Sequence, residues 1–90
     1  MAVGLIFTAP GVTRAQYEQV RNEVAPGNRP PAGMLYHAAG PGENGWCVAE
    51  VWESQEAADR FFREQLQQAL EKAGITGQPQ IFEVANTMQS

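Results

Sequence analysis

The chain of 90 residues has one cysteine, Cys47, and one histidine, His37. A single cysteine excludes a disulfide within the chain and fits a reducing compartment, so we expect a cytoplasmic protein. A single histidine with no second histidine or cysteine nearby cannot complete a zinc shell, so no metal site is expected. Because Cys47 lies between Trp46 and Val48, we expect its thiol to be buried and inert.

Basic residues are also scarce. Six Lys and Arg against ten Asp and Glu give a net charge of -4, and the basic residues are scattered, which disfavours nucleic acid as a partner. No apolar run approaches the roughly 20 residues that span a bilayer, so no membrane segment is expected. The first residues lack a basic segment, so no signal peptide is expected. No glycine-rich loop opens a helix as phosphate-binding loops do. The sequence predicts one small acidic domain over residues 1–90.

Turn and cap residues divide the chain into six predicted elements. The apolar segments bounded by Gly, Pro or Asn are predicted strands: 2–8, 33–40, 45–52 and 80–87. Helices are predicted to begin after the N-caps Thr13 and Ser54 and to end at Pro26 and Gly74. The resulting order, βαββαβ, predicts a ferredoxin-like α+β fold: a four-stranded antiparallel sheet with both helices on one face.

The predicted strands are apolar on both sides. Val3 and Leu5 point one way and Ile6 the other, and Trp52 alternates with Val51. A sheet with one face in water should instead alternate apolar and polar residues. Two helices cover one face, and exposing the other would cost on the order of 10 kcal/mol at about 25 cal/mol per Å². We therefore predict a homodimer, sheet face against sheet face, about a two-fold axis.

Several short motifs resemble those of a known group. They are a G-x-L-x-H strand, a GW strand entry and a VWES strand exit ahead of an Ala/Phe helix. The residues that carry them are Gly33, His37, Gly45, Trp46, Trp52, Glu53, Ser54, Ala57 and Phe61. With the βαββαβ order, the chain resembles the dimeric α/β-barrel proteins and, more narrowly, the antibiotic biosynthesis monooxygenase-like superfamily. The resemblance implies a dimeric barrel that binds a small apolar or aromatic ligand.

That superfamily includes cofactor-free monooxygenases acting on quinone-like or polyketide-like aromatics, and haem-degrading enzymes. The haem-degrading branch typically has an Asn on the first strand, a Trp in W-x-S and a His on the helix that follows. Trp52 matches the second element, but the first predicted strand has no Asn and the second predicted helix has no His. We therefore expect no cofactor, with haem on His37 kept as a weaker alternative.

His37 is the candidate catalytic residue, because imidazole exchanges protons near neutral pH and could take a proton from a phenol. The alternative is a hydrogen-bonded histidine in a sheet or at an interface. Glu50 shares the alternation of Trp46 and Trp52. If the hairpin register brings it beside His37, the two form a proton-handling pair; a slip of one residue would reverse the face. Glu50 could instead bond across the dimer interface.

The aromatic residues have a structural and a functional interpretation. Trp52 either anchors the second helix on the sheet or forms a flat wall of a ligand pocket, with its N–H on a polar partner. Tyr17, Tyr36, Phe61 and Phe62 are expected mostly in the core, with Phe61 and Tyr17 as candidates to line the pocket.

Two functions from different classes follow. The first is a dimer that binds a small apolar or aromatic ligand without turning it over. The second is a cofactor-independent monooxygenase, with His37 as base and Trp52 and Phe61 as pocket walls.

Overall fold

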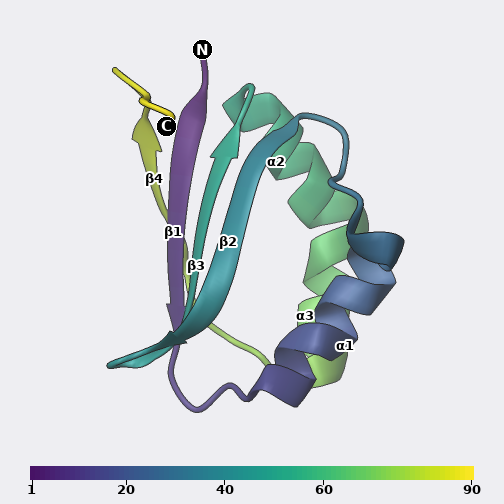
Figure 1. Ribbon diagram of the computed structural model, residues 1–90. Coiled ribbons are helices and arrows are strands. Elements are labelled where there is room, and N and C mark those ends of the chain that lie inside the picture. Colours follow the sequence, from purple (N-terminus) through teal and green to yellow (C-terminus); the bar gives the residue numbers. More distant parts are fainter.

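A computed structural model describes all residues, Met1–Ser90. Figure 1 shows one sheet with every helix on the same side. The elements are β1 (Val3–Ala9), α1 (Arg14–Val24), η1 (Pro26–Asn28), β2 (Met34–Gly42), β3 (Gly45–Trp52), α2 (Gln55–Phe61), η2 (Phe62–Leu66), α3 (Gln67–Ala73) and β4 (Gln80–Glu83). The strand order is β2-β3-β1-β4, and all neighbours are antiparallel. The predicted ferredoxin-like fold is confirmed.

The hairpin and the last strand differ in length from the prediction. β2 runs to Gly42, so only Glu43 and Asn44 remain as the turn. β4 ends at Glu83, four residues earlier than predicted. Because β4 is antiparallel to β1, it runs toward the first residues of the chain. One residue beyond β4, the Val84 N–H donates to the Ala2 carbonyl at 3.0 Å.

The helix caps lie where the sequence places them. The Thr13 hydroxyl accepts from the Gln16 N–H at 3.2 Å, and the Gln16 side chain accepts from the Thr13 N–H at 2.9 Å, which is a complete capping box. Ser54 accepts from the Ala57 N–H at 3.1 Å. Gly74 ends α3 in the left-handed conformation, with φ of 73°.

The second predicted helix is continuous from Gln55 to Ala73, but its middle turn, η2, is π-helical. Phe61 is buried, as predicted, and so is Ala69. Phe62, also predicted in the core, is 40% exposed, so that expectation is wrong. Phe61 already takes the position facing the sheet, and the next residue lies about 100° further around the helix.

The core is small and lies between the sheet and the helices. Ten of the 90 residues are buried. One cluster joins Val3, Trp52 and Phe61, and a second joins Val20 and Ile75 near the other end of the sheet. No helix has the length and apolar composition needed to cross a bilayer. A core this limited leaves a lone domain marginally stable.

No helix covers the other face of the sheet (Figure 1), and large apolar side chains are exposed there. Ile6, Tyr36 and Phe82 lie on it and are 47%, 59% and 50% exposed. The Phe82 ring lies over Gly4, where an added Cβ would overlap the ring at 2.2 Å. Tyr36 is therefore not a core residue, because the irregular register between β2 and β3 at Met34/Tyr36 keeps it opposite Val51 on this face.

Cys47 also corrects an expectation. It is exposed, not buried, because its position in β3 is one residue off that of the helix-facing Trp46. Its sulfur lies 3.6 Å from the Gly45 carbonyl and 4.0 Å from the Thr8 hydroxyl.

Candidate functional site

A chain of hydrogen bonds joins four side chains on the helix-facing side of the sheet. The Tyr17 hydroxyl lies 2.7 Å from His37 Nε2, and His37 Nδ1 lies 2.7 Å from Glu50 Oε2. The Trp52 indole N–H donates to Glu50 Oε1 at 2.9 Å. Three elements supply these residues: α1, β2 and β3. All four were singled out from the sequence as site candidates.

The register that pairs β2 with β3 explains how His37 and Glu50 meet. They are direct cross-strand partners, with Ala39 opposite Val48 as the next pair on the same face. The hypothesis that the hairpin brings His37 beside Glu50 is thus confirmed as geometry. A shift of one residue would have sent one of the two to the uncovered face.

The burial of Glu50 makes its partners important. Its side chain is 10% exposed, and that of His37 is 30% exposed. A carboxylate removed from water is tolerated when donors satisfy its oxygens, and here each oxygen has one N–H donor. The carboxylate therefore favours a proton on His37 Nδ1, which leaves Nε2 as an acceptor for the Tyr17 hydroxyl.

The electrostatics of Tyr17 agree with this proton arrangement. Burial raises the pKa of the Tyr17 phenol above its ordinary value, and the charges of Glu18 and Glu50 add to the increase while Arg21 opposes it. The phenol accordingly stays protonated and donates a hydrogen bond to His37 Nε2. A neutral phenol is a poor nucleophile, so the arrangement favours proton exchange over attack by tyrosinate.

Trp46 forms the other side of the Tyr17 environment. The rings of Tyr17 and Trp46 lie 5.1 Å apart at 33°, and the Arg14 guanidinium lies 5.4 Å above the Trp46 ring. Trp46 is 6% exposed, yet its indole N–H is buried without a hydrogen-bond partner. Trp46 and Trp52 share the helix-facing side of the sheet, as the alternation predicts. The contribution of Arg14 was missed, because the sequence gives no sign of which residue lies above Trp46.

Trp52 and Phe61 pack as core residues. Trp52 is 1% exposed, Phe61 is 6% exposed, and their rings lie 5.3 Å apart. The interpretation of Trp52 as the anchor of α2 fits this packing, and its N–H finds the predicted polar partner in Glu50. Both residues are closed off by packing, so a ligand could stack on either of them only if the helices moved.

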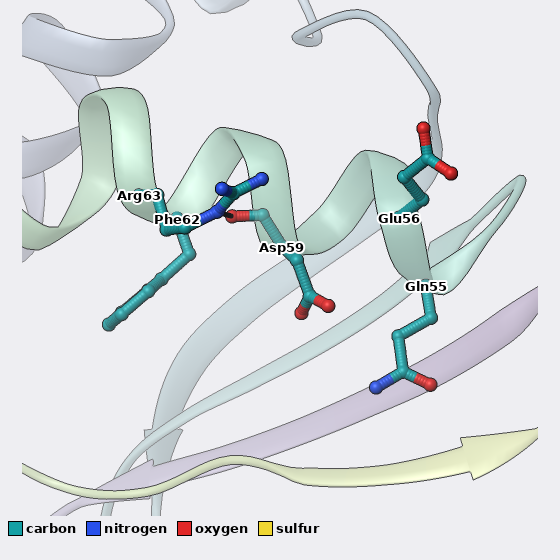
Figure 2. Close-up of a pocket in the computed structure, with 5 residues that line it drawn as sticks. All are labelled: Gln55, Glu56, Asp59, Phe62 and Arg63. Atoms are coloured by element: carbon teal, nitrogen blue, oxygen red, sulfur yellow. Dashed lines mark hydrogen bonds between the residues drawn. The ribbon is translucent and has the colours of Figure 1, made fainter.

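An open hollow of about 560 Å³ lies on α2 and η2, and neither Trp52 nor Phe61 lines it. Figure 2 shows its lining of Gln55, Glu56, Asp59, Phe62 and Arg63. Four of the five are polar or charged side chains, and Arg63 donates to the Asp59 carbonyl at 3.3 Å. A second hollow, of about 370 Å³, lies by the chain start and β4. Neither is lined by Tyr17, His37 or Glu50. We take the hydrogen-bonded chain as the candidate site because it joins titratable side chains, not because a hollow lies beside it.

Haem as a ligand of His37 would need a free ring nitrogen. In this structure Nε2 lies 2.7 Å from the Tyr17 hydroxyl and Nδ1 lies 2.7 Å from Glu50, so iron could bind Nε2 only after Tyr17 had moved away.

No family sequence model and no curated protein matches the chain. Solved structures resemble it over its full length. A candidate antibiotic biosynthesis monooxygenase from Chloroflexus aurantiacus has a TM-score of 0.70 at 17% identity, covering 99% of this chain and 98% of that one. SnoaB, a cofactor-independent oxygenase from Streptomyces nogalater, gives 0.66 at 17% identity as a point mutant, covering 99% and 96%. MhuD, a point mutant with two manganese protoporphyrin IX molecules per active site, gives 0.64 at 19%, covering 100% of both.

These likenesses define the fold. The protein has the ferredoxin-like fold of the antibiotic biosynthesis monooxygenases, as the GW and WES motifs led us to expect. The structures that share this fold include both a cofactor-independent oxygenase and a porphyrin-binding protein. The fold alone therefore does not choose between their activities.

Proposed function

We propose that the protein is a cofactor-independent monooxygenase for a phenolic, quinone-like aromatic substrate, with His37 as the base. The observation that carries this proposal is the bond between His37 and the largely buried Glu50 carboxylate, which leaves His37 Nε2 as a proton acceptor at a partly exposed position. The cofactor-independent oxygenase among the similar structures adds support by analogy of fold.

The chemistry needs only molecular oxygen as a second reactant. His37 Nε2 takes the phenolic proton of the substrate, and Glu50 stabilises the resulting imidazolium. The electron-rich anion bonds through its activated carbon to oxygen and forms a hydroperoxide, to which the proton on His37 returns. In an anthrone, whose phenolic tautomer gives up the proton, loss of water then converts the carbon that was CH₂ to a carbonyl, so that one oxygen atom enters the product and the other leaves as water.

The test is oxygen uptake with anthrones and hydroquinones, comparing the wild type with His37→Ala. Loss of the base should lower the rate by about 10²- to 10⁴-fold. Gln19→Ala, on an exposed position of α1, is the matched control and should keep the full rate. Equal rates for His37→Ala and the wild type would remove His37 from the mechanism.

Binding without turnover is the second candidate, favoured by analogy with the porphyrin-bound structure of the same fold. In that case the aromatic compounds would bind, as measured by quenching of tryptophan fluorescence, without consuming oxygen. We propose the cytoplasm as the location under either function, since the one exposed thiol suits a reducing compartment.

We also propose that a second copy of the chain covers the open sheet face. Ile6, Tyr36 and Phe82 leave an apolar surface on a domain with a small core, and a two-fold dimer would bury both copies of that surface at once. Sedimentation at micromolar concentration should give a dimer. Ile6→Glu should shift it to monomer or unfolded chain, whereas Gln19→Glu should not. A stable, folded wild-type monomer would refute this assembly.

A further inference from the structure

The Tyr17 ring has the surroundings that a bound phenol would need. It lies nearly parallel to the His37 ring, at 14° with centroids 6.0 Å apart, and it packs on Trp46 at 5.1 Å. Its hydroxyl meets the acceptor nitrogen of His37 at 2.7 Å. Aromatic contacts together with one directed hydrogen bond are the usual means by which a protein orients a phenol.

We propose that the Tyr17 side chain holds the place of the phenolic substrate, which binds by displacing it. This deepens the proposed function, because it states how a substrate hydroxyl reaches His37. While the Tyr17 hydroxyl is on Nε2, the base is occupied. When the Tyr17 side chain rotates away, the same nitrogen accepts the proton of the incoming phenol.

The attachment of α1 allows the side chain to move while the helix stays in place. Two side chains connect α1 to α3: Gln16 Nε2 donates to the Ala73 carbonyl at 3.0 Å, and Glu23 pairs with Lys72 at 3.4 Å. Tyr17 itself is only half-buried. Ala39, which lies between His37 and Trp46 along the helix-facing side, is small and exposed. Solvent therefore already reaches the sheet surface at this point.

The residues left behind indicate the class of ligand. His37 offers an acceptor for a phenol, and Trp46 offers a ring face and a buried N–H that has no partner. Displacement of the Tyr17 ring would have to uncover this N–H, and the donor would then favour a ligand with an oxygen acceptor. We expect a flat phenol that also carries a carbonyl or second hydroxyl, as hydroquinones and hydroxyanthrones do.

Removing the Tyr17 side chain should create a site for the fragment removed. Tyr17→Ala should bind 4-methylphenol at least about 10-fold more tightly than the wild type does, measured by isothermal titration calorimetry, with a matching rise in melting temperature. Toluene, which lacks the hydroxyl, should bind about 2- to 10-fold more weakly than 4-methylphenol, the range expected for one hydrogen bond. Gln19→Ala, at an exposed position of the same helix, is the control and should gain no such binding.

A folded Tyr17→Ala protein that binds 4-methylphenol no better than the wild type, or binds toluene equally well, would overturn the placement of the phenol. If Tyr17→Ala does not fold, Tyr17→Phe decides the matter, because it keeps the ring but frees His37 Nε2. Its affinity for hydroquinone should rise about 2- to 10-fold, and an unchanged or lower affinity would overturn the proposal. These are binding measurements, so a failure of oxygen uptake alone would count against the monooxygenase and leave this inference standing.

Discussion

The two tryptophans of β3 share one side of the sheet but have different surroundings. Trp52 is 1% exposed, packs on Phe61, and donates its N–H to Glu50. Trp46 is 6% exposed, packs on Tyr17, and has a buried N–H with no partner. Both indoles are buried, but only the Trp52 N–H has a hydrogen-bond acceptor.

This difference separates a closely packed end of the sheet from an end with an unmet hydrogen-bond donor, where we propose that the substrate binds. A fully satisfied, tightly packed residue contributes to stability and leaves no room for a ligand. An unmet donor beside a half-buried tyrosine weakens local packing and leaves a hydrogen bond for a ligand to make. Glu50 connects the two ends, since it accepts from Trp52 on one oxygen and from His37 on the other.

The largest effect we predict is on stability, from truncating the two tryptophans in turn. Trp52→Ala should lower the free energy of unfolding by about 3–5 kcal/mol, because it removes the most buried large side chain. The loss from Trp46→Ala should be about 1–3 kcal/mol smaller than that from Trp52→Ala, because this substitution also removes an unsatisfied buried donor. Urea denaturation followed by circular dichroism gives both values. Equal losses would mean that the two ends do not differ as described.

The part predictable from the sequence is the part controlled by local patterns. The caps at Thr13 and Ser54 and the order of elements follow from residues close together in the chain. The alternation in β3 places Glu50 on the side of both tryptophans, and the predicted hairpin offered His37 as its partner. A two-residue turn made that register the actual one.

The remainder depends on contacts between distant segments. The Tyr17–His37 bond joins α1 to β2, and nothing in either segment encodes how the helix is rotated. The exposure of Phe62 reflects the phase of a helix that contains a π turn. Cys47 looked buried because its sequence neighbours are apolar, but they face the opposite side of the strand.

The second prediction tests whether Glu50 serves the site as well as the fold. In Glu50→Gln the amide can still accept from Trp52, but its NH₂ group would face His37 Nδ1 and favour a proton on Nε2 instead. The substrate would then meet a donor where the wild type offers an acceptor. Oxygen uptake should fall about 100-fold, while the free energy of unfolding changes by about 1 kcal/mol.

The control for this substitution is Glu53→Gln, an exposed carboxylate just beyond the same strand, which should keep the wild-type rate. Nitrogen-15 NMR of the single histidine distinguishes a positioning role from a general loss of structure. The protonated nitrogen should change from Nδ1 to Nε2 in Glu50→Gln only. An unchanged tautomer together with reduced uptake would show that Glu50 acts in another way.

The smallest effect concerns Tyr17 and the alkaline side of the stability profile. Its pKa is raised in the folded state, chiefly by burial, so ionisation is harder there than in the unfolded chain, where it occurs near pH 10.0. The stabilisation from the neutral phenol is therefore complete below pH 10.0 and is lost as pH rises through the folded-state pKa. Urea unfolding between pH 8 and pH 11 should show a decline in the wild type that is shallower in Tyr17→Phe. Parallel profiles for the wild type and Tyr17→Phe would mean that the phenol is as easily ionised in the folded protein as in the unfolded chain, which would contradict the raised pKa.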